Sequence, residues 1–401
     1  MRLVRAPAAL SVPGDVLAGA AAARTPWHPR VLGATASSVC MYWAGMALND
    51  YADATTDAVE RPDRPIPSGR VPRRTALAVA TGLTAASLGL AAATGGRRGL
   101  LGALPLTGLV WAYDLGLKST PAGPAVMAGA RAADVLTGAL AVAPPGAGAT
   151  ALRRGALPAA LVGAHTYTLT ALSRHEISGA PAGVPARTLA ASTTAALLTA
   201  AGPVARGLRE RGGGTGGGGT GGRGLWAGIG TEARIGTVAR ESRAGIGAEA
   251  REPRAGAGTA ARLTPVTSTA VHASLPVSST PAGARVAVRA AALLGKRPQG
   301  RRTASASALL DGRPRDRRAA ATALLVGGAA LAYLGSYGAA QVKAVAAPSG
   351  ENVRGAVGAG ITALVPLQAA LTARAGSPVA AALLGAVHPV ARRLARRISP
   401  T

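Results

Sequence analysis

The chain has no phenylalanine and few aromatic residues of any kind. Phe is absent among 401 residues, and Phe, Trp and Tyr together make up 2%. Soluble proteins of this size usually build their cores around aromatic rings, because each ring buries a large apolar area. Hydrophobic residues still make up 48% of the chain, and the abundant small ones let helices pack closely inside a bilayer. The composition therefore favours a membrane protein.

The chain is also poor in cysteine and in acidic residues. A single cysteine, Cys40, excludes an internal disulfide and any metal site built from several thiolates. Basic residues outnumber acidic ones by 44 to 17, which gives a formal net charge of +27. A charge of this size is typical of nucleic-acid-binding proteins. Much of the arginine, however, lies within 206–318, and the rest mostly separates apolar runs. We therefore expect no nucleic-acid partner.

Apolar runs recur along the chain, separated by breaks that contain Arg, Pro or Gly. Crossing about 30 Å of hydrocarbon takes about 20 helical residues. On this basis the sequence predicts an all-α, multi-pass protein of the cell membrane, embedded in the lipid bilayer. About nine membrane-spanning helices are expected, at 8–23, 31–49, 75–94, 99–115, 123–143, 156–173, 184–205, 319–342 and 355–373. A tenth run, 378–391, is short and leads into four arginines, which predicts an interfacial segment.

Residues 206–318 differ from the rest of the chain. The segment begins with a run that is almost all glycine and continues without helical or strand periodicity. Such a segment cannot bury enough apolar area to offset the ordering of its backbone, which costs about 1–2 kcal/mol per residue. We predict a low-complexity, disordered insertion. It would separate 1–205, with seven spans and an acidic motif, from 319–401, with two spans and a basic tail.

Three aspartates crowd the end of the second predicted span. Asp50, Asp53 and Asp57 have the spacing that places side chains on one face of a helix, and Asn49 shares that face. Carboxylates gathered at the end of an apolar helix repel one another and need a cation. Oxygen ligands without His or Cys suit Mg²⁺, which often bridges one or two carboxylates to substrate phosphates. The sequence predicts a Mg²⁺ site here, and a solvated helix end is the alternative.

A basic loop follows the acidic face directly. Pro62, Pro65 and Pro67 end the helix and stiffen the loop. Arg64 and Arg70 on such a loop can each bind phosphate oxygens in a bidentate manner. The alternative is an ordinary basic loop on the cytoplasmic side of the membrane.

The two motifs together resemble the signature of a known family. The pattern N-D-x-x-D-x-x-x-D at 49–57, followed by R-P-I-P-S-G-R at 64–70, is similar to that of the UbiA superfamily of intramembrane prenyltransferases. The resemblance covers about 1–205 and 319–401. It implies nine transmembrane helices around a central cavity, Mg²⁺ as cofactor, a prenyl diphosphate as donor, and a hydrophobic or aromatic acceptor.

The resemblance also implies roles for particular residues. Those expected to serve catalysis are Asp50, Asp53, Asp57 and Lys118. Those expected to bind diphosphate are Asn49, Arg64, Arg70, Lys118 and Arg174. Those expected to bind metal are Asn49, Asp50, Asp53, Asp57 and Glu176.

The second acidic motif of this superfamily is degenerate here. Similar proteins usually carry at least two Asp after the sixth span, whereas this chain has only Glu176, beside Arg174 and His175. His175 could be a base on the acceptor side or an ordinary interfacial histidine. Deeper in the predicted spans, the sequence suggests that Asp134 pairs with Arg131, and that Asp15 lies in a cavity.

Other activities stay open at this point. Some members of the superfamily transfer a phosphoribosyl group to a lipid phosphate, and others cyclise prenyl chains. A transporter or a non-catalytic membrane scaffold is the alternative of another class, because intramembrane acids and arginines also line ion pathways.

Overall fold

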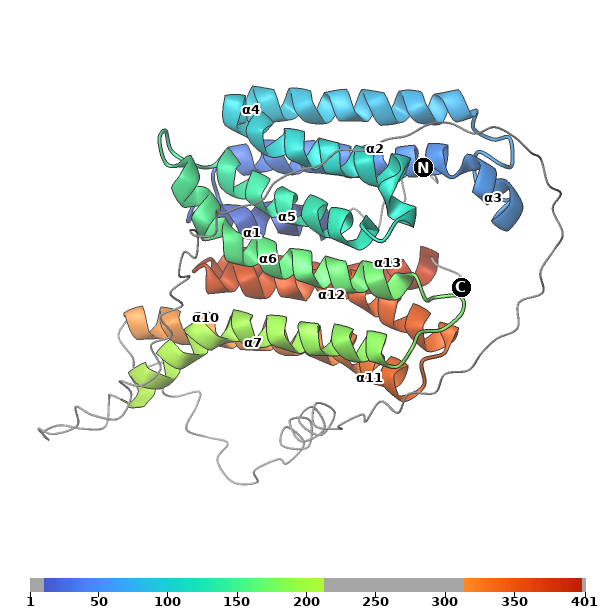
Figure 1. Cartoon of the computed structure of the whole chain (residues 1–401). Helices are drawn as coiled ribbons and strands as arrows, with labels where there is room; N and C mark the ends of the chain where they lie inside the picture. The colour runs from blue at the N-terminus through green and yellow to red at the C-terminus, as the bar shows by residue number, and fades with distance from the viewer. Residues whose placement is uncertain (1–10, 213–313, 399–401) are drawn as a thin grey trace, which may run out of the picture. The chain divides into compact units, whose positions relative to one another are not determined.

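The structure, a computed structural model, describes residues 11–212 and 314–398, and every regular element in these two ranges is a helix. Figure 1 shows the helices lying side by side, and we keep its labels. The elements are α1 (Val12–Ala22), α2 (Arg30–Ala52), α3 (Ala54–Glu60), α4 (Arg73–Leu115), the short turn η2 (Leu117–Ser119), α5 (Gly123–Ala141), α6 (Gly148–Ser173), α7 (Gly183–Gly212), α10 (Pro314–Tyr333), the π-helical turn η4 (Leu334–Gly338), α11 (Ala339–Ala346), α12 (Gly350–Arg374) and α13 (Pro378–Ile398).

Helix α4 contains two of the expected spans, 75–94 and 99–115, joined by a sharp turn. The backbone of Gly96 takes φ +56° and ψ −144°, a conformation that only glycine adopts readily. A Cβ atom on Gly99 would lie 2.1 Å from the carbonyl oxygen of Ala91. The second half of α4 therefore begins in close backbone contact with the end of the first, as the break between the two runs predicts.

Four helices in the described ranges are long and apolar enough to cross a membrane: Arg30–Ala52, Arg73–Leu115, Ala319–Ala346 and Gly350–Arg374. At 11 residues, α1 is shorter than a span. The expectation of an all-helical protein is confirmed for the described residues. The count of nine crossings stays a prediction.

Two segment boundaries differ from expectation. Helix α7 runs to Gly212 and α10 begins at Pro314, so regular helix extends into both ends of the predicted insertion 206–318. The rest of that insertion lies outside the described residues. The short run 378–391 forms part of α13, which continues to Ile398 and packs beside α12 and α10. An interfacial position for α13 stays a prediction.

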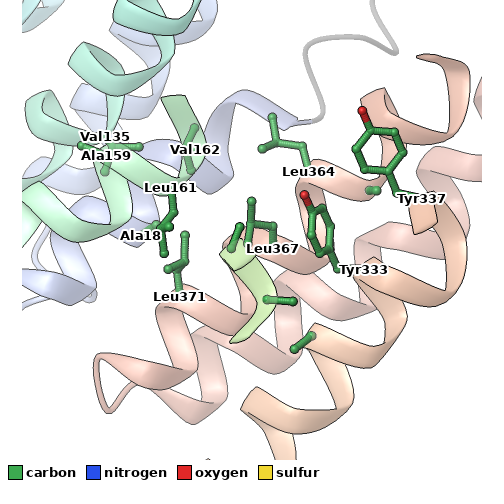
Figure 2. Packing of buried hydrophobic residues seen from close by; sticks show 14 residues of the cluster. Ala18, Val135, Ala159, Leu161, Val162, Tyr333, Tyr337, Leu364, Leu367 and Leu371 are labelled. Atoms are coloured by element: carbon green, nitrogen blue, oxygen red, sulfur yellow. The ribbon is translucent and has the colours of Figure 1, made fainter. Parts of the chain in front are cut away.

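The core is built mainly from alanine and aliphatic side chains, with two tyrosines among them. Figure 2 shows Tyr333 and Tyr337 on α10 and η4, beside leucines of α12. The hydroxyl of Tyr333 lies 2.9 Å from Nδ1 of His165, whose Nε2 lies 3.2 Å from the carbonyl oxygen of Gly360. The few aromatic residues thus include two that fill the centre of the α6, α10 and α12 contact.

Helices α1 and α5 pack backbone against backbone, and glycine makes this contact possible. A Cβ atom on Gly138 would lie 2.1 Å from the carbonyl oxygen of Val16. We expect Gly138→Val to destabilise the protein by about 3 kcal/mol, because the helices would have to separate. Gly108→Val on α4 is the matched control, since a Cβ there has nothing within 4 Å. Thermal unfolding in detergent measures both, and equal midpoints would contradict this account of the contact.

Candidate active site

Two of the predicted acids share one arginine. The residues Asp50 and Asp57 are each 5% exposed. Nη1 of Arg64 lies 2.8 Å from Oδ2 of Asp57 and 3.5 Å from Oδ1 of Asp50. Helix α2 ends at Ala52 and α3 begins at Ala54, yet the amides of Asp53 and Asp57 still bond four residues back. The nearly continuous helix explains why the two carboxylates converge on one point.

The third acid of the motif reaches a different cation. Oδ1 of Asp53 accepts a hydrogen bond from Nζ of Lys118, which lies in the η2 turn after α4. Both side chains are partly exposed. The structure thus brings Lys118 to the acidic motif, as expected, although 65 residues separate the pair in sequence.

Asn49 contacts an acid that the sequence analysis did not assign to the site. Its amide nitrogen donates to Oδ1 of Asp114 over 3.3 Å. The carboxylate of Asp114 is buried near the end of α4. Its position four residues before Lys118, at the end of an apolar helix, is the signal that could have identified it.

Two predicted phosphate-binding arginines do not contact these acids. The guanidinium of Arg70 binds its own loop, donating to the Ser68 hydroxyl over 2.8 Å and to the carbonyl oxygen of Asp63. Arg174 donates to the carbonyl oxygens of Lys118, over 2.9 Å, and of Thr120. Arg174 therefore holds the turn that carries Lys118, and its own contact with diphosphate stays a prediction.

The loop with the degenerate second motif packs on the start of α12. A Cβ on Gly350 would lie 2.8 Å from the carbonyl oxygen of Glu176, and Nη2 of Arg354 donates to the same oxygen over 3.3 Å. Burial raises the pKa of the Glu176 carboxyl, and the charges of Arg354 and Arg61 partly oppose that shift. A role of Glu176 in metal binding stays a prediction. His175 lies in the turn after α6.

A cavity of about 380 Å³ lies beside Asn49 and Asp114, between α2, α4, α5 and one residue of α12. Its walls are largely apolar, with Met41, Met46, Leu106, Val110, Met127, Ala130 and Ile361. Of the aromatic residues near the motif, Tyr42 and Tyr113 line it. The cavity is polar at both ends, because Ser38, Arg131 and Asp134 line the end away from Asn49.

Ser38, Tyr42, Arg131 and Asp134 are named here the inner polar cluster. The sequence suggested that Arg131 pairs with Asp134, but the structure gives Arg131 a different partner. Its Nη2 lies 2.7 Å from Oδ2 of Asp15 on α1. Asp134 instead accepts a hydrogen bond of 2.5 Å from Ser38. The expectation that Asp15 lies in a cavity is wrong, since it is fully buried behind Arg131 and does not line the cavity. These pairs join side chains from three different helices, α1, α2 and α5. The spacing of residues along one helix cannot predict such contacts.

Comparison with known proteins bears on what this site is for. The sequence profile of the UbiA prenyltransferase family matches residues 12–207, which include the acidic motif, Lys118 and the cavity-lining residues of α2, α4 and α5. Residues 12–207 belong to the UbiA prenyltransferase family. This family and the apolar helices mark the chain as a membrane protein.

Two curated relatives of this chain carry the same name. A digeranylgeranylglyceryl phosphate synthase of Methanopyrus kandleri is 41% identical over 110 residues, covering 27% of this chain and 38% of the relative. One of Halobacterium salinarum is 37% identical over 142 residues, covering 35% of this chain and 50% of the relative. The chain thus spans between a third and a half of the length of these relatives.

A solved structure gives a looser match. The apo structure of a UbiA homologue from Aeropyrum pernix K1 superposes with a TM-score of 0.43 and 24% identity, over 50% of this chain and 79% of that one. A superposition this loose adds no weight to the family assignment.

The UbiA-type acidic motif supplies only some of the ligands that a divalent cation needs. No three Asp, Glu, His or Cys side chains gather as metal ligands among the residues that the structure describes. Asp50 and Asp57 nevertheless converge on a single cationic nitrogen. A pair of buried carboxylates is what Mg²⁺ uses when substrate phosphates complete its coordination. The arrangement suits a metal that binds together with a diphosphate rather than alone.

Proposed function

We propose that this chain is a Mg²⁺-dependent prenyltransferase that moves the prenyl group of a prenyl diphosphate to a hydroxyl of a glyceryl phosphate-type acceptor. The observation that carries the proposal is the convergence of the buried Asp50 and Asp57 side chains on Arg64. Asn49, which precedes Asp50 on α2, lines the apolar cavity. Asp50, Asp53, Asp57 and Lys118 would then be the groups nearest the leaving diphosphate.

The proposed chemistry is management of charge on the leaving group. Bound Mg²⁺ would neutralise charge that develops on the departing diphosphate. Asp50 and Asp57 would hold it, with Asn49, Asp53 and Glu176 as further candidates. Arg64 would turn from the two carboxylates to phosphate oxygens, and Lys118 would leave Asp53 to do the same.

The walls of the cavity have a second role in this proposal. Departure of diphosphate leaves an allylic cation, which water would trap as an alcohol. Apolar side chains such as Met46, Val110 and Met127 line the cavity together with Asn49, and with substrate bound they would keep water from the cation. The electron pair of the broken carbon–oxygen bond leaves with pyrophosphate, the acceptor oxygen then bonds to the prenyl carbon, and the hydroxyl proton passes to the released pyrophosphate.

The relatives favour a hydroxyl acceptor over the aromatic one included in the sequence analysis. Their name denotes a glyceryl phosphate that carries two geranylgeranyl groups. Few aromatic side chains line the cavity, only Tyr42 and Tyr113 in its described lining, so little there would stack on an aromatic acceptor. We therefore propose a glyceryl phosphate hydroxyl as the nucleophile.

A donor panel tests the proposal. The purified full chain in lipid nanodiscs would be incubated with Mg²⁺, glyceryl phosphate lipids and either a prenyl diphosphate or phosphoribosyl diphosphate. We expect pyrophosphate release and an organic-soluble prenyl ether only with the prenyl donor. Release with phosphoribosyl diphosphate alone would assign the other transfer reaction, and a cyclic hydrocarbon product would assign cyclisation. No release with either donor would leave the transporter or scaffold alternative.

The two arginines of the basic loop should differ in their effect on turnover. We expect Arg64→Ala to lower kcat/KM for the prenyl donor about a hundredfold, because a charged donor at the site of developing charge is lost. Arg70→Ala should lower it severalfold at most, since Arg70 binds its own loop. Steady-state pyrophosphate release measures both variants. Equal losses would show that the loop rearranges to bring both arginines to the phosphates.

A further inference from the structure

The end of the cavity away from Asn49 is charged, which is costly inside an apolar helical protein. Arg131 and Asp134 are each less than one-tenth exposed and both line the cavity. Gln368 donates to Oδ1 of Asp15 over 2.7 Å, so the ion pair of Asp15 and Arg131 is supported from behind by α12. Buried charges persist where they are paired and hydrogen-bonded, and within membrane proteins they often mark functional sites.

The inner polar cluster is held too firmly to move aside for a ligand. Its side chains come from α2 and α5, and Arg131 is tied to α1 through both Asp15 and the Ser11 hydroxyl. Ser38 and Asp134 are joined across α2 and α5 by their hydrogen bond. A hydrocarbon chain in contact with these groups would remove their remaining solvation and offer no hydrogen bonds in return, which costs free energy. A prenyl chain therefore has to end before it reaches them.

The length of the apolar part follows from α2, which lines the cavity along its whole extent. Asn49 and Ser38 are eleven residues apart on this helix, which places about 16 Å of helix between them. A prenyl chain whose diphosphate lies at the acidic motif would enter the cavity at Asn49 and run along Met46 and Met41 toward Ser38. An extended farnesyl chain has about this length, and the additional isoprene unit of a geranylgeranyl chain would enter the inner polar cluster.

We propose that the inner polar cluster limits the donor to a farnesyl or shorter chain. The inference rests on the proposed function, because that function places the diphosphate at the acidic motif, next to the end of the cavity that Asn49 lines. It sets this chain apart from the relatives, whose name contains two geranylgeranyl groups. Ser38, Arg131 and Asp134 are then specificity-determining residues. They make contact with the end of a longer prenyl chain unfavourable, and they do not contact the reacting atoms.

Binding of unreactive donor analogues tests the limit without an acceptor. The probes are the thiolodiphosphates of geraniol, farnesol and geranylgeraniol, titrated into the detergent-solubilised full chain with and without Mg²⁺. We expect the geranylgeranyl analogue to bind at least about tenfold more weakly than the farnesyl analogue, the size of discrimination that pocket shape achieves for small apolar differences. Equal or tighter binding of the geranylgeranyl analogue would overturn the limit. Absence of Mg²⁺-dependent binding of all three would instead overturn the proposed function.

A double variant tests whether the polarity of the cluster is the cause. Ser38→Ala with Asp134→Leu replaces two of the three polar side chains that line this end of the cavity by apolar ones, and it leaves the third, Arg131, paired with Asp15. We expect this variant to bind the geranylgeranyl analogue at least as tightly as the farnesyl analogue. Ser37→Ala is the matched control, because Ser37 binds Ser87 on α4 and does not line the cavity. A folded double variant that keeps the tenfold difference would refute the role of polarity. If it does not fold, the wild-type comparison decides the length limit by itself.

Discussion

Asp57→Asn is expected to lower pyrophosphate release about a thousandfold, the upper range for loss of one preorganised electrostatic group. The buried carboxylate of Asp57 makes the shorter of the two contacts to Arg64, at 2.8 Å, and converges there with Asp50. Asparagine keeps the shape of the side chain but removes the charge that would bind Mg²⁺. Single-turnover release of pyrophosphate from a prenyl diphosphate at saturating Mg²⁺ is the measurement.

Asp63→Asn is the matched control for that variant. Asp63 lies in the same basic loop and is exposed, and its backbone carbonyl rather than its carboxylate contacts Arg70. We expect full activity and an unchanged elution profile in detergent for Asp63→Asn. Activity in Asp57→Asn close to that of the wild type would remove Asp57 from the metal site.

Lys118→Met should lower kcat about a hundredfold, because a cation at the leaving group stabilises charge that appears only in the transition state. In the absence of substrate, Lys118 contacts Asp53. Its replacement therefore also leaves that carboxylate unpaired, but both side chains are partly exposed, and water can solvate Asp53. We expect the thermal midpoint to change little while turnover falls.

Lys343→Met is the matched control, because it also replaces one lysine by methionine. Lys343 is exposed on α11 and lies far from the acidic motif along the sequence. Steady-state kinetics should give wild-type values for this variant. A kcat for Lys118→Met within a few fold of wild type would place the diphosphate elsewhere.

The parts of the site that sequence reasoning predicts are those set by spacing along one helix. Asp50 and Asp57 lie on one face because the helix continues almost unbroken from α2 into α3. The break between two apolar runs at 94–99 likewise predicts the turn at Gly96. Local periodicity carries this information, because side chains three, four and seven residues apart share a helix face.

The parts that it misses depend on which helices meet. Asp114 contacts Asn49 from another helix, and Arg131 pairs with Asp15 rather than with its neighbour Asp134. Arg70 follows the acids closely in sequence, yet its guanidinium binds Ser68 and the backbone of its own loop. Tertiary packing decides these partners, and no pattern within a single segment contains it.

Binding of Mn²⁺, as a spectroscopic substitute for Mg²⁺, to the solubilised full chain tests the central claim most directly. Electron paramagnetic resonance would follow free Mn²⁺ with and without pyrophosphate, in the wild type and in the Asp50→Asn/Asp57→Asn variant. We predict that the wild type takes up Mn²⁺ only when pyrophosphate is present and that the double variant takes up none. Two results would contradict the assignment of these two carboxylates to a metal–diphosphate site. One is equal uptake of Mn²⁺ by both proteins, and the other is the same uptake by the wild type with and without pyrophosphate.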